Sequence, residues 1–248
     1  MFSTFVHMNR YMIKLSYKGT NYHGWQIQPN ATTVQGVVNK ALSIILNSNI
    51  DTTGSGRTDT GVHAEVQVIH FDVANTLDDK FIYKLNGILP ADIAVQEVKN
   101  VSTEFHARFD ASSRAYQYRI KKIKDPFLQN SYYRFSYSLD VQLMNRAAST
   151  LLNYSNFESF SKVKTDVKTF DCTITEAYWE QLGDLLQFNI KANRFLRGMV
   201  RALVGTILDV GLKKITIEEF ENIIKAKDRT KAGRAVPPEG LFLTEVNY

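Results

Sequence analysis

YMIKLSY, residues 11–17, alternates apolar and polar side chains, and this period of two predicts a half-buried strand. After it, apolar residues recur at helical spacing from Val34 to Ile45, which predicts a helix. Thr32 and Gln35 form a candidate capping box for that helix. Three further elements follow: the strand AEVQVIHFDV (64–73), a short helix around KFIYKLNGIL (80–89) and the strand IAVQEVKNV (93–101). With a glycine-rich loop near the second strand, the order is β-α-β-β-α-β, the ferredoxin-like or RRM-like unit.

The second half of the chain has a similar order of elements. RAYQYRIKK (114–122) predicts a strand, and Asp140 is a candidate cap for the helix that follows. The segment 171–193 predicts a hairpin that turns near Gly183. The pattern ends with a helix that starts near Arg194, a helix at IEEFENIIKAK (217–227) and the strand LFLTEVNY (241–248). The duplication is inferred from the order of elements, because identity between the halves is negligible.

These patterns predict an α+β protein made of two ferredoxin-like (RRM-like) halves. We expect the first half at residues 1–104, with the glycine-rich loop, and the second half at residues 105–248. Their strands would form an extended, mostly antiparallel sheet with a central basic cleft.

Composition narrows the class of protein. The chain has 248 residues, of which 44% are hydrophobic, as in an ordinary globular protein. Its 30 basic and 25 acidic residues give a net charge of +5, which by itself is a weak indication of a nucleic-acid partner. The single cysteine, Cys172, excludes an intrachain disulfide and fits a reducing compartment. We read neither a signal peptide nor a membrane span, and therefore expect a cytoplasmic protein.

The glycine-rich loop GSGRTDTGVH (54–63) has one aspartate near its centre. Asp59 stands where a dinucleotide-binding loop has its third glycine, and no Gly-Lys-Ser/Thr ending is present, so neither common phosphate-binding pattern fits. Two readings of Asp59 stay open: a side chain that bonds the local backbone, or a nucleophile or general base. In extended backbone Arg57 lies on the same face as Asp59, because side chains two residues apart point the same way.

Basic residues gather at several places. Arg194, Arg197 and Arg201 would share one stripe of a helix, as a solvated face or as a phosphate-binding surface. Tyrosines lie among other basic clusters, which suits stacking on unpaired bases, although strand tyrosines are more often packed in a core. The clusters are Arg119, Lys121, Lys122 and Lys124; Lys162, Lys164 and Lys168; and Lys225, Lys227, Arg229, Lys231 and Arg234. The five histidines and the lone cysteine show no metal-ligand spacing, so we expect no metal site.

Six motifs, in order along nearly the whole chain, resemble those of the tRNA pseudouridine synthase A family. The motifs are YKGTNYHGWQIQP (17–29), GSGRTDTGVHA (54–64), FHARFDASSRAYQYRI (105–120), NRFLRGMVRALVG (193–205), KAKDRT (225–230) and EGLFL (239–243). The resemblance implies an isomerase that converts uridine to pseudouridine at positions 38, 39 and 40 of the tRNA anticodon stem-loop. It also implies a homodimer, with tRNA as the partner. No atoms enter or leave in this reaction, so neither a metal nor another cofactor is expected.

The same resemblance assigns roles to single residues. Asp59 would be the nucleophile, and Arg57 would help the base leave its stack, at an unstacking cost of about a few kcal/mol. Tyr116 would stack on the target base and assist removal of its C5 proton, Arg201 would pair with the catalytic carboxylate, and Leu241 would pack beside the pocket. RNA contacts would come from Phe105, His106, Ala107, Arg108 and Phe109, from the loop Lys164 to Lys168, and from Arg194 and Arg197. Attack at C1′, attack at C6 and abstraction of the 2′ proton all remain open.

Two other classes of protein compete with this reading. A non-catalytic RNA-binding protein with two RRM-like sheets would explain the charge and the aromatic residues, but it would not explain the pairing of Arg57 with Asp59 in the loop. An enzyme acting on nucleotide phosphates is disfavoured because both phosphate-binding patterns fail.

Overall fold

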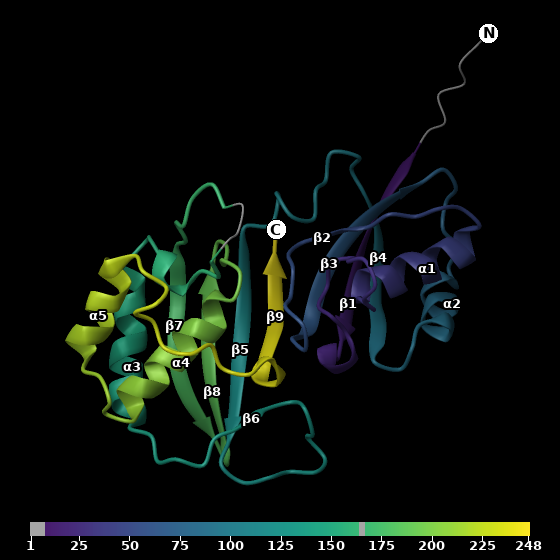
Figure 1. Cartoon of the computed structure of the whole chain (residues 1–248). Helices are drawn as coiled ribbons and strands as arrows, with labels where there is room; N and C mark the ends of the chain where they lie inside the picture. The colour runs from purple at the N-terminus through teal and green to yellow at the C-terminus, as the bar shows by residue number, and fades with distance from the viewer. Residues whose placement is uncertain (1–7, 164–166) are drawn as a thin grey trace. The chain divides into compact units, whose positions relative to one another are not determined.

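The computed structural model describes residues 8–163 and 167–248 of the chain. It divides into two compact units (Figure 1). The first unit contains the residues up to Ser112 together with Glu245–Tyr248, and the second unit is Ser113–Thr244. The predicted boundary at 104/105 therefore lies within the first unit. The description of the units as two ferredoxin-like halves stays a prediction.

The first unit is an antiparallel sheet with two helices. Its strands lie in the order β4-β1-β3, and a short strand, β2, pairs with β3. The elements are β1 (Asn9–Tyr17), the 3-10 helix η1 (Gly19–Asn21), α1 (Val34–Leu46), β2 (Thr53–Gly54), β3 (His63–Val73), α2 (Phe81–Ile88) and β4 (Ile93–Val101). The strands and helices predicted within residues 11–101 are confirmed.

Strand β1 is the centre of this sheet, and its alternating sequence explains why. Ile13 and Leu15 are fully buried, whereas Lys14 between them is half-buried. Ile13 pairs with Ile69 of β3 on one side and with Val98 of β4 on the other. The apolar face of β1 therefore contributes to the core of the first unit, as the period of two predicts.

The predicted cap of α1 is wrong by one residue. Thr33, and not Thr32, is the N-cap, and its side chain accepts a 3.3 Å hydrogen bond from Gly36 N. Gln35 has a different task, since its Oε1 accepts from Ile27 N and its Nε2 donates to Thr52 O. The amide of Gln35 thus joins two loops of the first unit instead of closing a capping box.

The second unit is a mixed layer of strands and three helices. β9, β5, β8 and β7 lie in this order; β5 pairs antiparallel with β8, β8 pairs antiparallel with β7, and β6 pairs parallel with β5. The strands are β5 (Ser113–Lys121), β6 (Tyr133–Arg134), β7 (Ile174–Leu182), β8 (Leu185–Ala192) and β9 (Leu241–Asn247), whose last residues belong to the first unit. The helices are α3 (Val141–Thr150), α4 (Met199–Gly211), α5 (Ile217–Ala226) and the 3-10 turns η2 (Leu151–Asn153), η3 (Glu158–Phe160) and η4 (Pro238–Gly240).

Helix α4 is the most deeply buried helix of the second unit, and it contacts α3 and α5 (Figure 1). Leu203, Val204 and Ile207 are fully buried, as their helical spacing predicts. Gly205 lets another part of the chain approach the helix, because a Cβ atom there would lie 1.9 Å from the carbonyl oxygen of Arg234. The segment before η4 is therefore packed directly on the backbone of α4.

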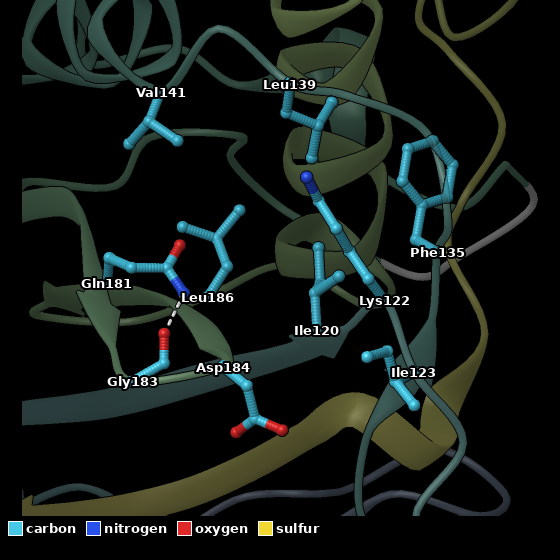
Figure 2. A pocket seen from close by; sticks show the side chains of 10 residues that line it. All are labelled: Ile120, Lys122, Ile123, Phe135, Leu139, Val141, Gln181, Gly183, Asp184 and Leu186. Atoms are coloured by element: carbon cyan, nitrogen blue, oxygen red, sulfur yellow. Dashed lines mark hydrogen bonds between the residues drawn. The ribbon is translucent and has the colours of Figure 1, made fainter.

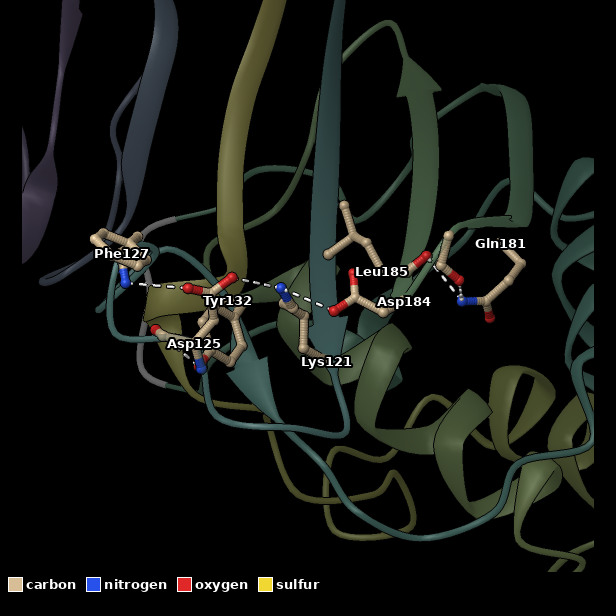
Figure 3. Close-up of polar contacts among 8 residues, drawn as sticks. Lys121, Asp125, Phe127, Tyr132, Gln181, Asp184 and Leu185 are labelled. Atoms are coloured by element: carbon tan, nitrogen blue, oxygen red, sulfur yellow. Dashed lines mark hydrogen bonds and ion pairs between the residues drawn. The ribbon is translucent and has the colours of Figure 1, made fainter.

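A buried lysine fixes one end of the second unit (Figure 3). Lys121 Nζ lies 2.7 Å from Asp125 Oδ2 and 3.0 Å from Asp184 Oδ2, and its side chain is only 7% exposed. Asp125 N also donates a 2.6 Å hydrogen bond to Tyr132 Oη. Hydrogen bonds to the two carboxylates raise the pKa of Lys121, and the ammonium lowers the pKa of Asp125. These contacts tie the segment after β5 to the turn between β7 and β8.

Among the described residues, no helix has both the length and the apolar character that crossing a membrane requires.

Candidate active site

The loop that carries Asp59 lies between β2 and β3 of the first unit, and β3 holds its first residues. Ser55 N donates a 2.7 Å hydrogen bond to Val68 O, and Ser55 Oγ donates a 2.5 Å bond to Gln67 Oε1. Gln67 Nε2 donates in turn to Gly56 O at 3.0 Å. Ser55 and Gln67 are both buried, at 1% and 0% exposure. A buried amide thus fixes the start of the loop, since buried polar groups need their partners.

The middle of the loop is held from the other side, at Thr58. Trp25 N donates a 3.2 Å hydrogen bond to Thr58 O, and the hydroxyls of Tyr17 and Thr58 share a hydrogen bond of 2.8 Å. Gly24, with φ at 85°, lets the backbone approach closely, since a Cβ atom there would lie 2.4 Å from Thr58 O. Thr58, the residue before Asp59, therefore has both its carbonyl and its hydroxyl fixed.

Asp59 follows this anchored residue and begins a tight turn. Its carbonyl accepts a hydrogen bond from Val62 N at 3.1 Å, and Gly61 takes a φ of 78° in the turn. Exposure alternates along the loop, because Arg57 is exposed, Thr58 is buried and Asp59 is half-buried. The loop therefore holds the Asp59 backbone in place, and that Arg57 and Asp59 share one face of it stays a prediction.

The remaining predicted site residues near the reaction centre belong to the second unit. Tyr116 lies in the middle of β5, is half-buried, and meets the ring of Phe195 edge-on with the centroids 5.1 Å apart. Arg201 is in the first turn of α4, where its Nε donates a 2.7 Å bond to Val236 O while Val236 N donates to Arg201 O. Leu241 is the first residue of β9 and is buried. That these three residues meet Asp59 at one site stays a prediction.

The predicted RNA-binding segment 105–109 belongs to the first unit and is built around His70. Ala107, which is fully buried, donates from its backbone N to His70 Nδ1 at 3.1 Å and accepts from Tyr248 Oη at 2.7 Å. Phe105 O accepts a 2.9 Å bond from Arg10 Nη1. Arg108 and Phe109, in contrast, are exposed, with the guanidinium 5.6 Å from the ring centroid. Hydrogen bonds thus hold the inner residues of the segment, while its outer residues expose a cation and an aromatic ring. This combination suits the binding of unpaired bases.

His70 is a neutral hydrogen-bond acceptor in this segment. Burial lowers its pKa to about 4, and the nearby charges of Arg10 and His106 act in the same direction. Between pH 6.5 and pH 4 the unfolded chain binds a proton at this position and the folded chain does not, so stability falls as the pH falls through this window.

We expect this loss to disappear when His70 is replaced by Asn. The Asn Oδ1 can accept from Ala107 N in place of Nδ1 but does not titrate. Lowering the pH from 7 to 5 should therefore reduce the free energy of unfolding more for wild type than for His70→Asn, as measured by urea unfolding of both proteins at both pH values. Parallel losses in the two proteins would contradict a buried, neutral His70.

The predicted arginine stripe on one helix is wrong. Helix α4 begins only at Met199, after Gly198 in the left-handed region with φ at 72°, a conformation that an α-helix cannot contain. Arg194 and Arg197 therefore precede the helix that contains Arg201. Arg194 Nη1 donates a long, 3.4 Å bond to Thr169 O, and Lys162 N donates to Arg197 O at 2.9 Å. These bonds link the segment that carries Arg194 and Arg197 to the chain near residues 162 and 169.

Lys168 is exposed in the same region, beside Thr169 in the sequence. Lys164, the other lysine predicted to contact RNA there, lies outside the described residues. The basic side chains around Arg194 thus come from two segments that are distant in sequence. Their contact with RNA stays a prediction.

The second unit also has a cavity of about 370 Å³, beside the hairpin of β7 and β8 (Figure 2). Its lining combines apolar side chains with Lys122 and Asp184, and none of the predicted site residues is among them. The residues that line it are Ile120, Lys122, Ile123, Phe135, Leu139, Val141, Gln181, Gly183, Asp184 and Leu186. Within the described part of the chain, no group of histidine, cysteine and acidic side chains is arranged to hold a metal ion.

Sequence reasoning missed the residues that support the site, namely Tyr17, Gln67 and His70. For Gln67 and His70 a signal existed, because both are polar residues in the part of β3 from Gln67 to Phe71, whose other residues are apolar and pack in the core. Tyr17 gave no such signal, since a tyrosine at the end of an alternating strand reads as an ordinary core residue.

Comparison with known proteins gives a consistent result. A family described as tRNA pseudouridine synthase matches residues 14–110 and 147–248, ranges that include Asp59 and Arg201 but not Tyr116. Proteins named tRNA pseudouridine synthase A from Parabacteroides distasonis and Bacteroides thetaiotaomicron are each 49% identical over 97% of this chain, which covers 96% and 91% of those proteins. One from Thermoanaerobacter is 42% identical over 97% of this chain and 100% of its own length.

Proposed function

Since this chain belongs to the tRNA pseudouridine synthase A family and is an isomerase that converts uridine to pseudouridine in tRNA, we propose that it acts on the anticodon stem-loop, at positions 38, 39 and 40. We further propose that it works as a cytoplasmic homodimer. Closed twofold pairing is the commonest form of soluble oligomer.

Asp59 is the nucleophile in this proposal, and the geometry of its loop is the observation that carries it. Buried hydrogen bonds at Ser55 and Thr58 hold the backbone on both sides of the turn, and the turn itself is closed by Val62 N. A carboxylate on such a loop is preorganised, so little order has to be created in the transition state. The loop of a non-catalytic binding protein would not need this support for one acidic residue.

The reaction rearranges bonds without adding or removing atoms. The C1′–N1 bond of uridine breaks, the uracil turns, a C1′–C5 bond forms, and the proton lost from C5 is balanced by the one gained at N1. The carboxylate of Asp59, as the nucleophile, attacks the reacting nucleotide after this nucleotide has left the stem. Arg57, exposed two residues earlier, helps the base out of its stack and offsets part of the unstacking cost of about a few kcal/mol.

The residues of the second unit complete the site in this proposal. Tyr116 stacks on the target base and assists removal of the C5 proton, and Leu241 packs beside the base. Arg201 pairs with the Asp59 carboxylate. Its Nε is already bonded to Val236 O, so the guanidinium plane is held in one orientation by the chain next to η4.

The RNA is held by basic side chains and by an exposed aromatic ring. Phe109 is 75% exposed beside Arg108, and the inner residues Phe105 and Ala107 are bonded within the first unit. Lys164 and Lys168, with Arg194 and Arg197, supply further contacts to phosphates. Such contacts position the RNA without reading its bases.

The experiment that tests the site is a map of the product. Unmodified tRNA with uridines at positions 38, 39 and 40 is incubated with the protein, treated with carbodiimide and read by primer extension. We expect new stops at these positions only. A tRNA with cytidine at all three positions is the matched control and should give none.

Stops elsewhere in the tRNA, with none in the anticodon arm, would contradict the proposed site. Binding of tRNA without any product would favour a non-catalytic RNA-binding role.

A further inference from the structure

We propose that Tyr17 is a positioning residue for Asp59, which it controls through the side chain of Thr58. This inference rests on the proposed role of Asp59. Tyr17 is the last residue of β1, the central strand of the first unit, and is 4% exposed. Its hydroxyl and that of Thr58, which is 8% exposed, share a buried hydrogen bond of 2.8 Å. A single peptide bond separates Thr58 from Asp59.

The ring of Tyr17 is itself fixed. It stacks on Trp25 with the ring centroids 6.1 Å apart and an angle of 28° between the planes. Trp25 is 1% exposed, and it lies so close to Gly54 that a Cβ atom there would be 2.6 Å from Trp25 Nε1. Movement of the tyrosine ring would therefore disturb a close-packed group.

The other hydrogen bonds of the loop hold its backbone but do not involve the Thr58 side chain. Trp25 N bonds the Thr58 carbonyl, and Ser55 with Gln67 fixes the loop three residues earlier. The hydroxyl of Tyr17 adds the missing restraint on the Thr58 side chain. With the carbonyl and the side chain of one residue both held, the direction in which the chain enters Asp59 is fixed. A reacting group needs this kind of restraint, because a displacement of 1 Å can cost about 100-fold in rate.

The test removes one hydroxyl at a time. Tyr17→Phe and Thr58→Val are each expected to lower the single-turnover rate of pseudouridine formation about 10- to 100-fold, with little change in the affinity for tRNA. The double variant should lose no more than the worse single variant, because both remove the same bond. Thr58→Ser retains the hydroxyl and should restore a rate near that of wild type.

Tyr11→Phe is the matched control for a merely structural effect. Tyr11 lies on the same strand and is also buried, but its hydroxyl accepts a 3.1 Å bond from Leu77 N, outside the loop. Its loss should lower the thermal midpoint and leave the rate unchanged.

Three outcomes would overturn the inference. The first is a Tyr17→Phe rate equal to that of Tyr11→Phe, and the second is a loss confined to tRNA affinity. The third is an additive loss in the double variant. Asp59→Ala, assayed alongside, separates the two claims. An active Asp59→Ala variant removes the proposed role of Asp59 and this inference with it, whereas an inactive one beside an unaffected Tyr17→Phe removes this inference alone.

Discussion

Replacement of Asp59 by alanine is expected to lower the rate of pseudouridine formation by about 10³-fold or more, the scale of loss when a nucleophile is removed. The affinity for tRNA should stay within a few-fold of wild type, since the residues that we propose to bind RNA are untouched. The fold should also persist, because the bonds at Ser55 and Thr58 and the bond from Val62 N to the Asp59 carbonyl do not use the Asp59 side chain. Carbodiimide mapping under single-turnover conditions gives the rate, and filter binding gives the affinity.

Asp79→Ala is the matched control for this substitution. Asp79 is an exposed aspartate of the same unit, so its removal makes the same change in net charge away from the loop. We expect wild-type activity from it. Asp59→Asn separates charge from shape, and it should be as inactive as Asp59→Ala. A rate for either Asp59 variant close to that of Asp79→Ala would refute the assignment of Asp59 as the nucleophile.

The second large effect is expected at Gly205 in α4. In Gly205→Ala the new Cβ would lie 1.9 Å from the carbonyl oxygen of Arg234, a backbone atom that cannot turn away as a side chain can. Overpacking of this kind costs about 1–3 kcal/mol and sometimes more, and the better helix propensity of alanine returns about 1 kcal/mol. Because a 1.9 Å approach is a severe overlap, we expect a cost at the upper end of this range and hence a net loss of about 2 kcal/mol, which corresponds to a decrease of roughly 5 °C in the thermal midpoint.

Gly87→Ala is the matched control, because Gly87 also lies in a helix, α2, and has nothing within 4 Å of an added Cβ. It should raise the midpoint slightly. Gly205→Ala should also reduce activity below its melting range, since the displaced segment includes Val236, whose carbonyl holds Arg201 Nε. Equal thermal midpoints for the two variants would contradict this prediction, because the backbone around Arg234 would then move away from the new Cβ without a loss of stability.

The sequence predicted the elements well because their signals are local. The alternation from Tyr11 to Tyr17 and the helical spacing from Leu203 to Ile207 both depend on which side chains face the core, and both are confirmed. The errors were at the ends of helices. Thr32 and Thr33 are both good caps, and only the backbone decides which hydroxyl reaches Gly36 N.

The site was predictable only in part. Asp59 stood out because an acidic residue in a glycine-rich loop breaks the phosphate-binding patterns. The predicted start of the helix that contains Arg201 was too early. The arginine spacing fits a helix from Arg194 onward, and nothing in the residue types shows that Gly198 adopts a left-handed conformation. The support from Tyr17 could not be found in the sequence, since a hydrogen bond between residues 41 positions apart leaves no periodic trace.

Residues 245–248 determine when the first unit can finish folding during synthesis. Ser112 N donates to Asn247 O, and Tyr248 Oη donates to the carbonyl of Ala107, so these late residues hold the segment 105–112, which includes the residues we propose to contact RNA. They leave the ribosome after every residue of the second unit. The nascent first unit must therefore wait, with its segment 105–112 incompletely held, until the whole of the second unit has been translated. The surface that we propose for tRNA is thus completed only after the second unit has been translated.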